Sequence, residues 1–342
     1  MYNHRVRIRS SDSDQELASK EESIRKIRVR PSAVFLWPLV FFLIALWQTP
    51  AWGHGVVGKR VFIEPLVTED ANVKNELDLP TAEFLVQPDG SWRSIGFSFE
   101  KALYPHRFSF VLEGDRIYKH EGSRAIAGWD NLKVGLKWES YQNAQHEFVL
   151  SPALFFTFPV GSIGVTARET VLQPMILYGK GFGDLRWPLL KPFAIQGDFG
   201  YGASVTGPHD RQLLYDDVLF YSIPYLNRWV RHADAGYSLE HSLRRGFSCG
   251  AFFGDLFPFL EFNGASDVKS SPGGTSTFLR PGILWMGKYA QVSLAADIPL
   301  QGEELGPNRH VGVYLVVDWF LDDIVPAFHW TPFGNHHVRD EE

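Results

Sequence analysis

The sequence predicts an all-β fold, a transmembrane antiparallel β-barrel of about twelve strands. Three observations predict it: a composition rich in strand and turn formers, several long segments that alternate apolar and polar residues, and no sustained helical period. The chain has 342 residues, and its 27 Phe, 12 Tyr and 11 Trp occur beside 31 Gly and 21 Pro. This mixture disfavours a helix bundle.

The overall composition excludes several other classes. Mean hydropathy is -0.13 and 21% of residues are charged, whereas a multi-helix membrane protein needs roughly 20 mainly apolar residues per span. The net charge is -6, and an acidic chain of this kind is not a nucleic-acid binder. The only cysteine, Cys249, cannot form an internal disulfide, and we interpret it as a small strand side chain.

The N-terminal region has the pattern of an export signal. An uncharged run, AVFLWPLVFFLIALW, occupies residues 33–47, and small residues follow at Ala51 and Gly53. Basic residues precede the run, namely Arg25, Lys26, Arg28 and Arg30. The run is short for a membrane span and suits a signal peptide over residues 1–53, cut before His54. The alternative is an uncleaved N-terminal anchor.

Residues 54–80 show no strand alternation and carry five acidic residues, Glu64, Glu69, Asp70, Glu76 and Asp78. We expect an irregular segment that lies across the barrel mouth as a plug would. The rival interpretation is a disordered leader to the first strand.

Residues 81–342 are expected to form the barrel and a short C-terminal tail. The clearest alternation is at 309–321, where Val313, Leu315 and Val317 share one face and Asp318 lies on the other. Four more segments alternate in the same way: 131–138, 195–205, 233–240 and 292–298. Weaker candidates are 81–86, 94–101, 106–112, 146–158, 173–184, 246–255 and 275–286. After Phe320 either a short strand at 327–333 or a tail is expected.

A soluble β-sandwich would also alternate, since one face of each of its sheets is buried. The segments here run near ten residues, which is longer than typical sandwich strands. Aromatic residues lie near segment ends, where a membrane barrel has its interfacial girdles. Small residues on the opposite face predict a wide, hydrated lumen.

The polar face of these segments must then point into the lumen, because a charge facing lipid at mid-depth costs on the order of 2 to 4 kcal/mol. The predicted lumen-facing set is Asn131, Lys133, Lys137, Gln196, Asp198, Asp234, Glu240, Asp297 and Asp318. Any permeation role belongs to this set as a whole.

Two stretches also carry a family resemblance. The stretch HGVVGKRVF from His54 to Phe62, followed by Gly-rich alternating strands, is similar to the outer-membrane barrels allied to the phenol meta-pathway transporter family, as is the run FPFLEFNG at 257–264. The resemblance implies a channel for hydrophobic or aromatic compounds.

Specific chemical sites are weakly indicated. His54 with His336 and His337 could bind Cu(II), but the pattern is more typical of solvated termini, and we predict no metal and no cofactor. A lipid-acting enzyme on the barrel is the alternative function, with His232, His241, Ser238 and Ser242 as its candidate residues. The chain has no common catalytic motif, so we predict no enzyme activity.

The predicted function is therefore an outer-membrane channel or uptake port for small hydrophobic or aromatic solutes. Its partners are outer-membrane lipid and a small-molecule solute, without nucleic acid. A structural outer-membrane barrel is the third alternative, and the sequence leaves the oligomeric state open.

Overall fold

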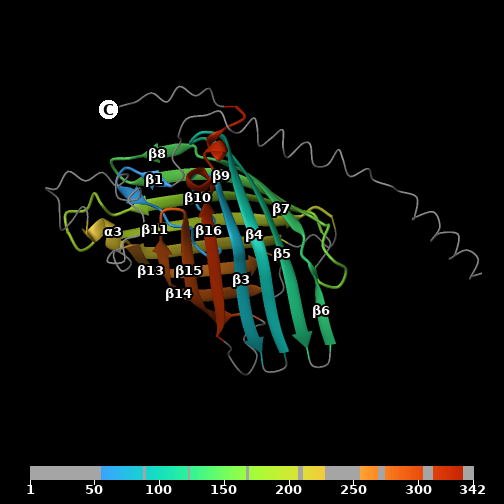
Figure 1. Ribbon diagram of the computed structural model, residues 1–342. Helices are drawn as coiled ribbons and strands as arrows, with labels where there is room; N and C mark the ends of the chain where they lie inside the picture. Colours follow the sequence, from blue (N-terminus) through green and yellow to red (C-terminus); the bar gives the residue numbers. More distant parts are fainter. Residues whose placement is uncertain are drawn as a thin grey trace, which may run out of the picture. The chain divides into compact units, whose positions relative to one another are not determined.

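The computed structural model describes residues 55–87, 90–121, 124–166, 169–206, 211–227, 255–268, 274–302 and 311–333. Nearly all of the regular structure in them is β-strand (Figure 1). The elements are β1 (Val56–Val57), β2 (Arg60–Val61), β3 (Glu76–Gln87), β4 (Gly90–Tyr104), β5 (Phe108–Glu121), β6 (Arg124–Trp129), β7 (Leu132–Trp138), β8 (Tyr141–Asn143), β9 (Phe148–Phe158), β10 (Val171–Gly181), β11 (Phe193–Ser204), β12 (Arg211–Tyr221), α3 (Ile223–Tyr225), β13 (Leu256–Asp267), β14 (Thr275–Met286), β15 (Ala290–Gln301), β16 (Gly312–Phe320), α5 (Leu321–Ile324) and η4 (Pro326–His329).

The strands close into an antiparallel barrel of 12 strands, as the sequence predicts. Around the ring the order is β10-β11-β12-β13-β14-β15-β16-β3-β4-β5-β7-β9, and pairing of β9 with β10 closes it. Strand β6 continues the wall beyond β7 by pairing with the other half of β5, and β8 adds to the edge of β9. Closure leaves no free edge around the ring, which is what lets strands cross a membrane.

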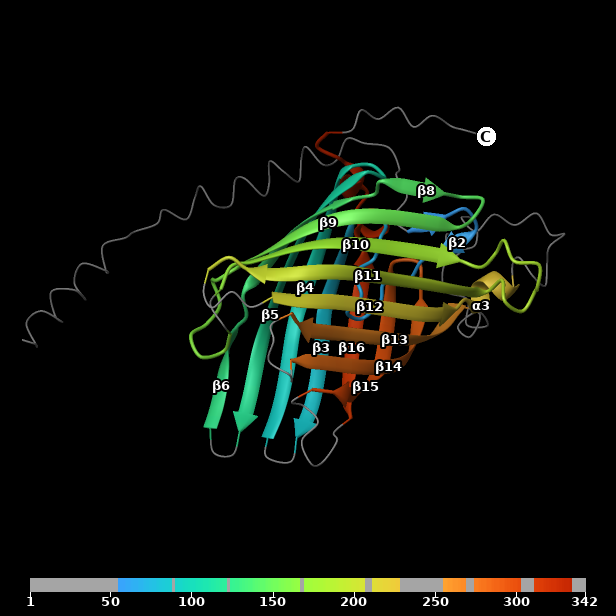
Figure 2. The same ribbon diagram turned by 180° about the vertical axis from the view of Figure 1, so that it is seen from behind.

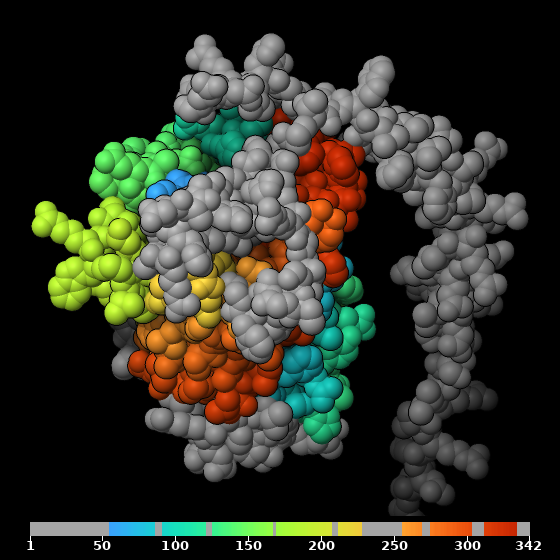
Figure 3. Space-filling view, turned by 60° about the vertical axis from the view of Figure 1, so that its left-hand side comes forward, coloured from blue at the N-terminus to red at the C-terminus, as the bar shows by residue number. Residues whose placement is uncertain are grey.

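Alternation along the strands gives the barrel an apolar outside. On β16, Val313 and Trp319 are exposed, whereas Val316 and Asp318 between them are buried. Its partner β15 repeats the pattern, with Leu294 exposed beside buried Ser293 and Ala295. Figure 3 shows the outward side chains of this wall, in orange and red, as a continuous surface. An apolar band of this extent around a closed barrel is the surface of a membrane protein.

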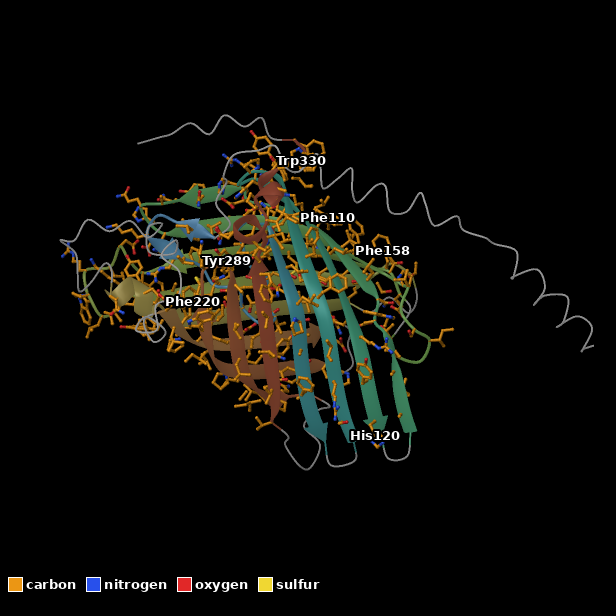
Figure 4. All side chains as sticks on the ribbon, in the orientation of Figure 1. Phe110, His120, Phe158, Phe220, Tyr289 and Trp330 are labelled. Carbon is orange, nitrogen blue, oxygen red and sulfur yellow. The ribbon has the colours of Figure 1, made fainter. Side chains whose placement is uncertain are left out.

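The strands are strongly inclined. Seen from one side, β16 and β3 to β5 cross in front of β9 to β13, and the view from behind shows the same crossing (Figures 1 and 2). Tilt of this kind is required to close a twisted sheet. We call the end where β3 begins and β16 stops the terminal end, and the opposite end the far end. Figure 4 labels Trp330 at the terminal end and His120 near the far end.

The first barrel strand starts earlier than expected, at Glu76 and not at residue 81. Leu77 and Leu79 point outward and Glu76 and Asp78 inward, so the alternation is present but short. Pro80 obscures it, because proline has no N–H for the ladder and is unusual inside a strand. The register with both neighbouring strands shifts at this position, which accommodates the proline.

The chain after β16 does not form another strand. Residues 327–333 lie in the 3-10 helix η4 and the turn beyond it, so of the two alternatives given for this region the strand is wrong. Pro326 at the start of η4 favours a helical turn over a strand. The predicted strand at 233–240 lies outside the described residues, as does the one at 246–255 except for Asp255, and β12 pairs directly with β13. Within the described ranges, the helices are too short or too polar to cross a bilayer.

Candidate functional site: the barrel lumen and its internal segment

Residues 55–75, called the internal segment here, contact inward side chains from many strands. Hydrogen bonds join the segment to Glu100 on β4, Lys137 on β7, Gln196 on β11 and Glu261 on β13. Strands β4 and β13 are separated by four strands on one side of the ring and six on the other. A segment that touches both therefore lies within the lumen.

The first half of the segment is a short hairpin. Strands β1 and β2 pair, and Gly58 occupies the turn with a φ of 63°. A side chain at this position would be strained, and its Cβ would also meet the carbonyl oxygen of Ala144. Glycine therefore fits both the turn and the close approach of the loop before β9.

This hairpin packs into a hydrophobic core inside the barrel. Phe62 is 2% exposed, and its ring meets Phe220 edge-on with 6.4 Å between centroids. Buried Val57, Ile63 and Leu66 belong to the same cluster. Inward residues of the wall complete it, including Phe155, Leu177, Phe257, Phe259 and Leu284. The expected hydrated lumen is thus wrong over this part, because bulky inward side chains pack on the segment.

Arg60 fixes the hairpin at the terminal end. Its guanidinium donates from Nε and Nη2 to Glu147 Oε2, at 3.2 and 3.1 Å, and from Nη1 to the Pro192 carbonyl oxygen at 2.9 Å. The Tyr225 ring lies 4.0 Å below the guanidinium, and the Tyr225 hydroxyl donates to Glu147 Oε1 at 2.9 Å. A fully buried arginine is tolerated because almost every donor of its planar fork has a partner.

The second half of the segment is held by carboxylates of the wall. Glu261, completely buried, accepts from the backbone N–H groups of Leu66, Val67 and Thr68 at 2.9, 2.9 and 2.8 Å. The Thr68 hydroxyl donates to the same carboxylate at 2.9 Å. Successive N–H groups that converge on one anion form a nest, and each such charge-assisted bond is stronger than a neutral one.

Buried lysines neutralise the acidic residues of this half. Lys74 Nζ lies 2.6 Å from Glu64, 2.5 Å from Asp70 and 3.1 Å from Glu76. Although burial alone would lower it, these carboxylates raise the pKa of Lys74 well above its ordinary value.

At the terminal end, the carboxyl group of Glu139 has a pKa above the ordinary value of a glutamate. Glu139, in the loop after β7, accepts a hydrogen bond from the Val73 N–H at 3.2 Å. Burial raises the pKa of Glu139 to about 7, and this hydrogen bond opposes the shift.

Six of the nine residues in the predicted lumen set are inward and have partners. Lys133 bonds Glu69 at 2.7 Å, Lys137 bonds Glu100 at 2.6 Å, and Asp198 accepts from the Glu69 N–H at 2.9 Å. Gln196 both accepts from and donates to the backbone of Ile63, at 3.0 Å each. Asp297 lies 2.9 Å from Arg280 and Asp318 accepts from Gln291 at 3.1 Å.

The other three members differ. Asn131 lies in the break between β6 and β7, and its side chain bonds Gly161 and Thr166 of the following loop instead of the internal segment. The prediction that Asn131 faces the lumen assumed an unbroken strand, and the break between β6 and β7 interrupts the alternation at this residue. Asp234 and Glu240 lie outside the described residues.

Sequence reasoning missed Glu261, Arg280, Glu147 and Arg60. The first two lie on strands that are apolar on both faces, since Phe257 and Phe259 point inward beside Glu261. A period of two is invisible when inward residues pack on a hydrophobic segment. The only available signal was a charged residue within an otherwise apolar run.

A cavity of about 570 Å³ lies in the lumen toward the far end. Val67 of the internal segment forms part of its floor and is 39% exposed. The walls come from β3, β4, β5, β14 and β16 and carry Trp92, Phe278 and Tyr314. The internal segment thus separates this cavity from the terminal end.

Other chemistry finds little support in the described ranges. They contain no group of three or more His, Cys, Asp or Glu placed to hold a metal ion. His54, His336 and His337 lie outside those ranges, as do Cys249 and the enzyme candidates His232, His241, Ser238 and Ser242.

Comparison with known proteins yields structural matches only. No protein-family model and no curated protein matches the chain. The NanC porin matches with 10% identity and a TM-score of 0.45, over 71% of this chain and 98% of that one. An outer-membrane channel from Pseudomonas putida F1 matches with 11% identity and a TM-score of 0.46, over 75% and 99%. LpxR from Salmonella typhimurium matches with 11% identity and a TM-score of 0.40, over 72% and 99%.

Likeness at these identities and TM-scores concerns the fold and not the function. The closed ring and its apolar outer band make the chain a β-barrel of the bacterial outer membrane. The resemblance to the phenol meta-pathway family stays a prediction.

Proposed function

We propose that the protein is an outer-membrane channel or uptake port for small hydrophobic or aromatic solutes, with the internal segment as its plug. The observation that carries the proposal is the aromatic cavity of the lumen, which ends at Val67 of that segment. A solute that enters from the far end would reach aromatic walls and then a barrier made of the chain itself.

In this proposal the two halves of the plug have different roles. The hairpin up to Leu66 is an anchor, since it is packed in a hydrophobic core and held by Arg60. Residues 67–75 are the gate, since their contacts are mainly hydrogen bonds and ion pairs to Glu261, Asp198 and Lys137. Water can replace polar contacts of this kind when the gate moves, whereas exposing the core of the anchor costs far more.

The terminal end faces the periplasm in this proposal. An exported chain reaches the outer membrane from that side, and in barrels with an even number of strands both ends of the chain lie on one side. The cavity then opens toward the outside, as suits uptake.

Glu261→Gln tests the proposal in the full chain, reconstituted into vesicles for swelling assays with toluene-sized aromatic solutes and a small sugar. The substitution removes the negative charge that three N–H groups share, and charge-assisted bonds each contribute about 1.5 to 3 kcal/mol. We expect solute flux to rise by about tenfold or more relative to the natural sequence.

Glu169→Gln is the matched control, because it makes the same chemical change in the loop before β10 and should leave flux unchanged. If neither the natural protein nor Glu261→Gln gives any flux, although both barrels are folded, the channel function is contradicted. If the natural protein and Glu261→Gln give equally high flux, the channel function stands and only the role of residues 67–75 as a gate is contradicted.

A further inference from the structure

The cavity at the far end combines aromatic walls with a lysine, Lys119, that has no partner among the described residues. Trp92, Phe278 and Tyr314 supply the aromatic surface, from β4, β14 and β16 respectively. Such faces bind flat rings by burial and by edge-to-face or stacked contact. A volume of about 570 Å³ falls within the range of small-molecule sites.

Arg280 also lines the cavity, but its charge is already paired. Its Nε lies 2.9 Å from Asp297 Oδ1, its Nη2 lies 3.6 Å from Glu83, and its Nη1 donates to Asn263. The guanidinium is buried and lies over the rings of Phe278 and Tyr314, at 4.8 and 5.5 Å from their centroids. It shapes the wall and leaves little charge for a ligand.

Lys119 also lines the cavity and, unlike Arg280, is not next to a carboxylate in the described residues. It lies on β5 directly opposite Trp92 on β4, and both side chains line the cavity. Among the described residues the Lys119 ammonium has no hydrogen bond or ion pair, in contrast with the paired Lys74, Lys133 and Lys137. An unpaired ammonium beside an aromatic wall is complementary to an anion on an aromatic ring.

We propose that this cavity binds small aromatic carboxylates of the size of benzoate, with the ring against Trp92 and the carboxylate on the Lys119 ammonium. The proposal rests on the channel function above and names the class of solute. Glu83 is the competing feature, because a carboxylate could instead select an aromatic amine. Glu83, however, already lies beside the Arg280 guanidinium, as Asp297 does, so its charge is partly neutralised by that cation.

The test is calorimetric titration of the full-length, detergent-solubilised protein with benzoate, benzyl alcohol and benzylamine, which share a ring and differ in charge. We expect benzoate to bind about tenfold or more tightly than benzyl alcohol, as one charge-assisted contact allows. Lys119→Met should abolish the difference, and Lys119→Arg should keep most of it. Lys288→Met, in the turn before β15 at the terminal end, is the matched control and should bind as the natural sequence does.

Equal affinity for benzoate and benzyl alcohol, tighter binding of benzylamine, or an unchanged preference in Lys119→Met would each overturn the site. Single-channel conductance in KCl, recorded on the same preparations, separates this proposal from the channel function. Intact conductance without benzoate preference refutes the site alone. Benzoate binding in a barrel without conductance supports the site and refutes the channel.

Discussion

Arg60 shows how a single residue can hold a segment inside the barrel. It lies beside Lys59 in the sequence, yet Lys59 is exposed and Arg60 is completely buried. The difference follows from the hairpin turn at Gly58, which directs Arg60 toward Glu147 and Tyr225. Nothing in the local sequence distinguishes the two basic residues, because the partners of Arg60 lie 87 and more positions away in the sequence.

Replacing Arg60 by methionine should destabilise the folded barrel by about 3 to 5 kcal/mol, since Glu147 would stay buried without its partner. Urea-induced unfolding in lipid vesicles, followed by tryptophan fluorescence, measures the loss. Lys59→Met is the control and should change stability by less than about 0.5 kcal/mol. The double variant Arg60→Met, Glu147→Gln should recover part of the loss, and a double variant as unstable as the sum of its singles would argue against the pair.

Leu294 tests whether the outer face of the barrel contacts lipid. Leu294 on β15 is 48% exposed in the outer band and pairs with Leu315 of β16. Leu294→Arg should therefore cost about 2 to 4 kcal/mol in a vesicle assembly assay, as expected near mid-depth. Leu294→Met keeps an apolar surface and should assemble normally. Equal tolerance of the two substitutions would mean that this face does not meet lipid.

At the scale of elements, the two halves of the internal segment should respond differently to mutation. Phe62→Ala removes a ring from the core formed with Phe220, and we expect a loss of about 3 to 5 kcal/mol. Thr68→Ala removes one hydroxyl contact to Glu261 and should cost only about 1 kcal/mol. Limited proteolysis should cut the segment faster in the first variant. Equal cleavage of both would contradict the division into anchor and gate.

The strands that the sequence predicts well are those with a polar lumen face. Along β16 and β11 the inward Asp318, Gln196 and Asp198 make the alternation plain. Strand β14 is only a weaker candidate in the sequence, and β13 is not predicted at all, because bulky inward residues of both strands pack in the core with the hairpin and hide the period. The contacts of the lumen could not be derived from periodicity, since they depend on where residues 55–75 pass relative to all the strands.

For the whole molecule, the decisive property is that one chain supplies both the pore wall and what fills it. The barrel ring alone would enclose a wide lumen, but its inward aromatic residues are buried only because the internal segment covers them. Removing the whole segment would expose that core, so its deletion tests folding and permeation together. Movement of the gate is better tested by fixing it in place.

A disulfide between the gate and the wall should hold the closed state. Thr68 Oγ1 lies 3.5 Å from Asn263 Nδ2, so we choose these two positions for cysteines, in a background where Cys249 is replaced by serine, and mass analysis shows whether the bond forms. We expect oxidation to reduce solute flux through the reconstituted barrel to the level of protein-free vesicles, and dithiothreitol to restore it. The single Thr68→Cys variant controls for the reagents. If oxidised and reduced double variants conduct equally, although mass analysis shows the bond, solutes must pass without movement of residues 67–75. Loss of flux on oxidation requires that the gate moves as part of transport, because the bond constrains that segment and leaves the barrel wall intact.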